Sequence, residues 1–258
     1  MIKHDLIEEN YYSPESNMTY MSASQFKDFL SCESMALAKL NLKYNEPKST
    51  ALLVGSYVDA HFEGTLDIFK AKNSDIFTQK GELKAPYKKA EEVISRIERD
   101  GMFSSFMSGA KQVIMIGEIA NVPFKIKIDS YFENEMIVDL KVIKDFERIW
   151  AGNLGKIPFV EFWGYDIQGA IYQEIVRQNT GMLLPFYIAA ATKEDEPNIE
   201  IMEIEQSRLD YCLGIVKENA PGFAEIKSGL ILPNKCGKCD YCKSVKILEG
   251  IVNYKNVR

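Results

Sequence analysis

Two strand-like segments between Ile126 and Val142 each carry an acidic residue, and this combination constrains the fold more than any other feature of the sequence. The stretch reads IKIDSYFENEMIVDLKV, and its alternating apolar residues predict two β-strands. Asp129 lies on the first segment, Asp139 lies on the second, and Lys141 follows two residues later. A fold that buries these strands must therefore give the charges a partner, since an unpaired buried charge is costly.

The turn between the two segments decides whether the acids meet. Side chains alternate between the two faces of a strand, so a three-residue turn at Glu133–Glu135 would place Asp129 opposite Asp139. Like charges directly opposite each other destabilise a sheet, unless one takes up a proton or a cation lies between them. A divalent metal with oxygen ligands is the natural resolution, and Lys141 would then steady a phosphate or a metal-activated water on the same face. A two- or four-residue turn would separate the acids.

The same charges also suit a solvent-exposed strand face, because a D-x-K triplet is short. Residues elsewhere bear on this choice. His61 lies on a mostly apolar helix-like segment, where a lone histidine is either a satisfied core residue or a metal ligand. Gln168 and Tyr172 lie four residues apart on a later helix-like segment and therefore share one face. From the hairpin alone, both interpretations remain open.

The order of elements along the chain predicts the fold class. Periodicity predicts helices over 20–40, 49–69, 85–107, 160–181 and 207–229, and strands over 112–119, 122–132, 136–143, 183–192 and 198–205. Helices, a β-meander, a helix, two strands and a helix indicate an α/β fold with a mixed central sheet flanked by helices, rather than repeated βαβ units. We expect one domain over 1–258, with a core at about 49–205, an N-terminal helix at about 20–41 and a C-terminal part over 206–258.

Composition narrows the class of protein. The chain has 258 residues, of which 46% are hydrophobic, enough for a sizeable core. Its net charge of −6 argues against a protein that coats nucleic acid non-specifically, but it does not exclude a nucleic-acid enzyme with a local basic groove and acidic metal ligands. A polar, acidic N-terminus and the lack of an 18-residue apolar run predict no membrane partner and a cytoplasmic location.

Taken in order, these residues resemble the PD-(D/E)XK nuclease superfamily, its RecB-like branch, and within it the phage and prophage exonucleases of the RecE type (exodeoxyribonuclease VIII). The branch has a helical G-x-x-x-H-type motif, matched by Gly55 and His61 at a wider spacing. Its strand aspartate is matched by Asp129, its D/E-x-K by Asp139–Lys141, and its Q-x-x-x-Y by Gln168–Tyr172. The resemblance covers nearly the whole chain and implies a restriction-endonuclease-like core.

The resemblance also implies a metal-dependent mechanism. His61, Asp129 and Asp139, with the backbone carbonyl of Leu140, would hold Mg²⁺ or Mn²⁺, which lowers the pKa of a bound water. Lys141 would orient that water and offset the charge that develops on the phosphate.

Further residues are expected around this centre. Gln168 and Tyr172 would contact the DNA strand beside it. Lys125 and Lys127, on the strand face that carries the first acid, would either touch backbone phosphates or form a solvated edge. Glu118, near the end of a neighbouring strand, would be either an extra acid ligand or a surface residue.

The cysteines predict a second metal centre. Cys236, Cys239 and Cys242 lie in CGKCDYC, which supplies three thiolates where a closed site needs four. Cys32 is the candidate fourth ligand, because SASQFKDFLSCESMA resembles the first cysteine segment of RecB-like nucleases that carry a [4Fe–4S] cluster joining the two chain ends. Zn²⁺ is the alternative. Cys212, in an apolar helix, is expected to be a buried structural thiol.

These implications predict a metal-dependent DNA exonuclease. The resemblance further implies 5′→3′ action on duplex ends, with the resulting single strands passed to a single-strand annealing protein in phage-type recombination. Two alternatives remain: a non-catalytic DNA-binding module with a structural metal, and a single-strand nuclease or endonuclease of the same fold. A homo-oligomer is also open, since relatives form toroidal trimers or tetramers.

Overall fold

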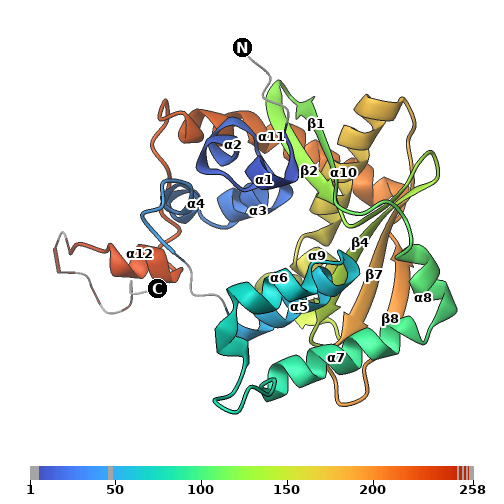
Figure 1. Ribbon diagram of the computed structural model, residues 1–258. Coiled ribbons are helices and arrows are strands. Elements are labelled where there is room, and N and C mark those ends of the chain that lie inside the picture. Colours follow the sequence, from blue (N-terminus) through green and yellow to red (C-terminus); the bar gives the residue numbers. More distant parts are fainter. Residues whose placement is uncertain (1–5, 46–48, 249, 252, 254, 256–258) are drawn as a thin grey trace.

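A four-stranded mixed sheet with the order β3-β4-β7-β8 occupies the centre of the molecule (Figure 1). This computed structural model describes residues 6–45, 49–248, 250, 251, 253 and 255. The strands are β3 (Ser130–Phe132), β4 (Met136–Ile143), β7 (Phe186–Thr192) and β8 (Ile199–Glu203). The β4 and β7 strands are parallel and the other neighbours are antiparallel. The predicted α/β class with a mixed central sheet is therefore confirmed.

A separate hairpin precedes this sheet. It consists of β1 (Val113–Ile119) and β2 (Val122–Ile128), joined by two residues with positive φ, Ala120 and Asn121. Such a pair matches the backbone twist of a two-residue hairpin turn. The predicted strand over 122–132 is split at Asp129, where β2 leaves one sheet and β3 enters the other.

The turn between β3 and β4 has the three-residue length at which the sequence would bring the two acids together. Phe132 pairs with Met136, so three residues connect the strands, and Asn134 takes a left-handed φ of 62° in the middle. Asparagine tolerates this conformation better than most residues. The register along β4 therefore places alternate residues on opposite faces as the sequence predicts.

Helices cover both faces of the sheet and bury two apolar layers. Ile137 of β4 and Phe186 of β7 contribute to one layer, and Val138 and Leu140 to the other. The first layer is closed by α3 (Ala23–Ser31), α10 (Tyr165–Thr180) and α11 (Gln206–Lys227), and the second by α5 (Thr50–Phe62), α7 (Ala85–Glu98) and α8 (Gly101–Phe106). Asp139 and Lys141 alternate with the second-layer residues, so they face the side covered by α3 and α10.

Two predicted helices are each broken in a way that shapes the molecule. Cys32, with an extended backbone (φ −164°), ends α3 and begins α4 (Glu33–Leu40). Gly164, with a φ of 63°, separates α9 (Phe159–Phe162) from α10. Glycine adopts this left-handed conformation at little cost, so the chain turns sharply there.

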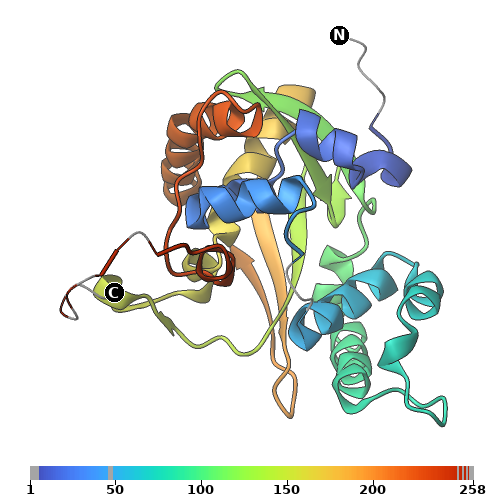
Figure 2. The ribbon, with the colours of Figure 1, turned by 90° about the vertical axis from the view of Figure 1, so that its left-hand side faces the viewer.

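The remaining elements lie at the periphery. They are α1 (Glu8–Tyr11), α2 (Pro14–Thr19), α6 (Leu66–Lys72), β5 (Ile149–Trp150), β6 (Lys156–Ile157), α12 (Asp240–Ser244) and 3₁₀ turns at Ser74–Ile76 and Gly152–Leu154. The C-terminal helix α12 packs beside α4 (Figures 1 and 2). Among the described residues, no helix combines the length and the apolar character that a membrane crossing requires.

Candidate active site and cysteine cluster

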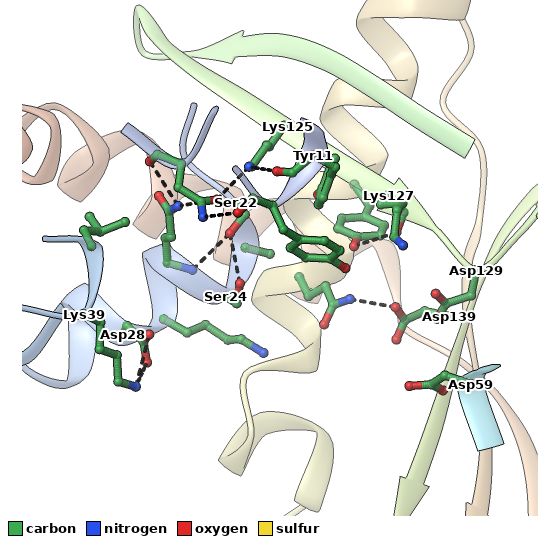
Figure 3. Close-up of a pocket in the computed structure, with 18 of the residues that line it drawn as sticks. Tyr11, Ser22, Ser24, Asp28, Lys39, Asp59, Lys125, Lys127, Asp129 and Asp139 are labelled. Carbon is green, nitrogen blue, oxygen red and sulfur yellow. Dashed lines mark hydrogen bonds and ion pairs between the residues drawn. The ribbon is translucent and has the colours of Figure 1, made fainter. Parts of the chain in front are cut away.

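Three aspartates from three elements line a cleft of about 470 Å³ between the N-terminal helices and the sheet (Figure 3). Asp59 comes from α5, Asp129 from the bend after β2, and Asp139 from the middle of β4. Lys141 and Gln168 line the same cleft. The fold therefore brings the acid–acid–lysine set into one cavity.

Asp129 is held by the backbone of β4. Its Oδ2 accepts a hydrogen bond from the Leu140 amide at 2.9 Å, and its Oδ1 lies 3.5 Å from Gln112 Nε2. Burial, and then the negative charge of Asp139, raise the pKa of Asp129 to about 7. Without a cation, ionising both carboxylates is therefore costly.

Asp139 is only 2% exposed and is contacted on both oxygens. Oδ1 accepts a hydrogen bond from Gln168 Nε2 at 2.6 Å, and Oδ2 forms an ion pair with Lys141 Nζ. The lysine also donates to the Leu140 carbonyl at 3.2 Å. Burial opposes the charge on Lys141, but Asp139 and then Asp129 overcome this effect and raise its pKa. Lys141 is thus a protonated ammonium group beside the acids.

The structure places His61 outside the cleft. Its Nε2 lies 2.8 Å from Glu98 Oε1 on α7, and the ring does not line the cleft. Asp59, one half-turn earlier on α5, takes the place in the cleft. Burial and the charge of Asp129 raise the pKa of Asp59 well above its usual range. The signal was present in the sequence, because Asp59 lies four residues after Gly55, at the spacing of the G-x-x-x-H motif.

Gln168 and Tyr172 both line the cleft, as their shared helix face predicts. Their polar atoms, however, form hydrogen bonds within the protein. Gln168 holds Asp139, and the Tyr172 hydroxyl donates to the Lys127 carbonyl at 3.0 Å. Both residues therefore position the site in this structure, and contact with DNA stays a prediction.

The two lysines of β2 lie in different environments. Lys127 lines the cleft, and its Nζ lies 5.1 Å from the centroid of the Tyr12 ring. Lys125 is only 1% exposed, and its Nζ donates to the Tyr11 carbonyl and to Asn17 Oδ1 (Figure 3). The buried ammonium group of Lys125 joins α1 and α2 to the hairpin, so its position does not favour the predicted contact with DNA.

Glu118 lies outside the cleft. Its backbone exchanges two hydrogen bonds with the Gln178 side chain, and its own side chain is exposed. Glu63, the residue that follows α5 and lies four positions after Asp59, lines the cleft instead. The four-residue spacing from Asp59 explains why Glu63 faces the cleft, although the family motif does not include this position.

The carboxylate cluster suits a hard divalent cation. Mg²⁺ and Mn²⁺ prefer oxygen ligands, and the cleft offers carboxylates from Asp59, Asp129 and Asp139. Burial, and then the negative charge of a neighbouring aspartate, raise the pKa of both Asp129 and Asp59. A bound divalent ion would supply neutralising positive charge.

Four cysteines form a second cluster where α12 packs beside α4. The Sγ atoms of Cys32, Cys236, Cys239 and Cys242 all lie within 4.8 Å of one another, and Cys32 and Cys242 are separated by 3.5 Å. The extended residue between α3 and α4 thus brings its thiol to the C-terminal loop. This arrangement agrees with a metal site of four thiolates, as the spacing predicts.

Two backbone amides stabilise the thiolate form of Cys236, which is the form that binds a metal. The amides of Lys238 and Cys239 both donate to Cys236 Sγ at 3.4 Å, and the Cys239 and Lys238 amides lower the pKa of that thiol to about 6. Burial instead raises the pKa of Cys32. Cys212 is fully buried in α11, as predicted for a structural thiol.

Comparisons with known proteins agree with this geometry. The family model described as "PDDEXK-like domain of unknown function (DUF3799)" matches residues 22–245. A crystal structure from Eubacterium rectale, named "Putative exonuclease", is 50% identical with a TM-score of 0.93, and the match covers 97% of each chain. The crystal structure of SSO0001 is 11% identical over 81% of this chain and 90% of that chain, and its TM-score of 0.31 is too low to carry an argument. Among curated proteins, none matches the chain.

Proposed function

Because the chain belongs to the family of the PDDEXK-like domain of unknown function, we propose that it is a metal-dependent nuclease that hydrolyses phosphodiester bonds of DNA. One observation carries the proposal: Asp129 and Asp139 enter one cleft from adjacent backbone segments, with Lys141 beside them. The name of the similar protein from Eubacterium rectale supports the same chemistry.

Each residue of the centre has a distinct part in the proposed reaction. Asp59, Asp129 and Asp139, together with the Leu140 carbonyl, would hold Mg²⁺ or Mn²⁺. When bound, the ion supplies a Lewis acid that lowers the pKa of a water and polarises the phosphate. Lys141 donates hydrogen bonds to the attacking water and offsets negative charge on the phosphate.

Two further contacts hold the acids in place for this reaction. The Leu140 amide fixes the direction of the Asp129 carboxylate, and Gln168 Nε2 fixes that of Asp139. Preorganised groups of this kind need not rearrange as charge develops, which is why they lower the barrier.

The finer proposal is a RecE-type exonuclease that acts 5′→3′ on duplex ends and passes single strands to an annealing protein. Its support is the order of motifs from Gly55 to Tyr172, and the name of the similar protein favours an exonuclease over an endonuclease. A homo-oligomer belongs to the same proposal, since the family that the chain resembles includes toroidal trimers and tetramers.

The test compares linear duplex, closed circular duplex and end-blocked linear duplex, each in Mg²⁺ and in Mn²⁺. The proposal expects nucleotide release from free-ended duplex alone, with release from a strand labelled at its 5′ end before one labelled at its 3′ end. Nicking of the closed circle supports an endonuclease instead. Salt-sensitive DNA binding without cleavage in either metal supports a non-catalytic module.

We further propose that the four cysteines hold one metal centre that joins α4 to α12. The resemblance implies a [4Fe–4S] cluster, in which each thiolate binds a different iron and the sulfurs stand apart. The observed separations of 3.5 Å and 3.9 Å between Sγ atoms are instead close to the edge of about 3.8 Å that tetrahedral Zn–S bonds give. The spacing therefore favours Zn²⁺. Anaerobic purification decides: a colourless protein with stoichiometric zinc supports this assignment, and a brown protein with iron and sulfide contradicts it.

A further inference from the structure

The lysines that line the cleft differ in what they contact. They are Lys27, Lys39, Lys125, Lys127 and Lys141. Lys39 pairs with Asp28 at 3.2 Å, and Lys141 pairs with Asp139. Lys125 is buried among oxygen acceptors of α1 and α2. In the described part of the chain, neither Lys127 nor Lys27, on α3, forms an ion pair with a carboxylate. Lys127 lies over the Tyr12 ring, whereas Lys27 and Lys141 lie around the ring of Tyr165.

Lys27 lies close to the catalytic lysine. Its Nζ lies 5.3 Å from the centroid of the Tyr165 ring, and Lys141 Nζ lies 5.2 Å from the same centroid. It donates one hydrogen bond, to the Trp163 carbonyl at 3.3 Å. An ammonium group can donate three, so two remain for a ligand in the cleft.

The break between α9 and α10 makes room for this side chain. A Cβ on Gly164 would lie 2.9 Å from Lys27 Cδ, closer than ordinary contact allows. The glycine also takes a φ of 63°, which side-chain-bearing residues rarely adopt. The backbone is thus shaped around the lysine stem, and the ammonium group is held at a defined place in the wall of the cleft.

We propose that Lys27 binds a phosphate of the DNA strand next to the phosphate that is cleaved, so that α3 forms one wall of the substrate path. This inference rests on the proposed nuclease function. A phosphate is the ligand that fits, since it supplies the anionic oxygens that Lys27 lacks and is repeated along the strand beside the scissile bond. A carboxylate or a neutral ligand would not explain why the ammonium group of Lys27 lies next to a DNA-cleaving centre.

The test separates binding from cleavage. Binding of a labelled single-stranded oligonucleotide is measured in Ca²⁺ over a series of KCl concentrations, with and without a 5′-phosphate. Lys27→Met is expected to reduce the slope of log K against log salt by about 0.7, the value for one phosphate contact on a single strand. In Mg²⁺, it is expected to raise KM about tenfold and to leave kcat within about twofold, since the lost contact is made equally by ground and transition states.

Two control variants distinguish phosphate binding by Lys27 from a general loss of positive charge and from a structural role. Lys88→Met removes an exposed lysine of α7 that pairs with Glu82, and it is expected to change neither slope nor KM. Lys27→Arg is expected to restore the slope, which a purely structural role would not require. If Lys27→Met unfolds, Lys27→Gln keeps a donor for the Trp163 carbonyl and carries the same test.

The outcomes are distinguishable. A loss of slope on both oligonucleotides assigns Lys27 to a backbone phosphate, and a loss only with the 5′-phosphate assigns it to a terminal one. An unchanged slope and KM for Lys27→Met overturn the inference, even if the wild type cleaves DNA. If the wild type binds but never cleaves, the nuclease proposal fails, and the salt slopes still decide whether Lys27 contacts phosphate.

Discussion

The Asp129 carboxylate accepts the Leu140 amide at 2.9 Å, so a side chain takes the hydrogen bond that a neighbouring strand would otherwise accept. This contact falls where β2 ends and β3 begins. This hydrogen bond fixes the Asp129 carboxylate relative to Leu140, the residue that follows Asp139. The spacing of the two acids is therefore set by backbone geometry rather than by flexible side chains.

We expect Asp59, rather than His61, to be essential for cleavage. Asp59→Asn keeps the side-chain shape and removes a charge from the cleft, so the initial rate in Mg²⁺ should fall at least about a hundredfold. His61→Gln should stay within about threefold of the wild type, because His61 contacts Glu98 outside the cleft. The reverse order of effects would show that the histidine, and not the aspartate, serves the centre.

The stability of the metal-free protein should depend on pH in a defined direction. The pKa of Asp129 is raised from 3.8 to about 7 by burial and then by Asp139, so from about pH 4 to pH 7 the folded chain holds a proton that the unfolded chain releases. The free energy of unfolding should therefore fall as pH rises through this range and level off above it.

Added Mg²⁺ should reverse that trend, because it binds the ionised carboxylates. In thermal unfolding, the gain in Tm on adding Mg²⁺ should be larger at pH 8 than at pH 5.5. Asp129→Asn serves as the control and should reduce both the pH slope and the gain. An equal gain at the two pH values would argue against a metal at these acids.

The cysteine cluster should stabilise the packing of α12 beside α4. Cys236 is exposed, so Cys236→Ser removes a ligand without opening the core, and it should release the bound metal and lower Tm by roughly 5 °C or more. Cys212→Ala is the matched control, since it should keep the metal and cost only about 1 kcal/mol of core packing. Retention of metal by Cys236→Ser would contradict the assignment.

The two lysines of β2 should give opposite phenotypes. Lys125→Met leaves acceptors of α1 and α2 unsatisfied, so chemical denaturation should show a loss of about 1–3 kcal/mol with DNA affinity unchanged. Lys127→Met should leave stability nearly unchanged and weaken DNA binding at low salt. Equal effects of both substitutions on DNA affinity would contradict the burial of Lys125.

Much of the centre could be predicted because it depends on local rules. Alternation along β4 places Asp139 and Lys141 on one face, as the sequence predicts. The observed pairing of Phe132 with Met136 then selects the three-residue turn among the lengths that the sequence left open. Helical spacing likewise places Gln168 and Tyr172 in the same cleft. These features need only neighbouring residues in the chain.

Other features depend on contacts between distant segments, which periodicity does not encode. The strand breaks at Asp129 because the Leu140 amide, eleven residues away, bonds its side chain. Lys125 alternates as an outward residue, but α1 and α2 cover it. The α3–α4 helix breaks at Cys32 where its thiol meets the C-terminal cysteines.

The most direct test of the central claim is the initial rate of nucleotide release from linear duplex DNA in Mg²⁺, measured for the wild type and for Asp139→Ala. Matched circular dichroism spectra and melting curves show that both proteins are folded. We predict release by the wild type and a rate at least roughly 10³-fold lower for the variant, since it loses a metal ligand and the ion pair with Lys141. Equal rates for the two proteins would contradict the account.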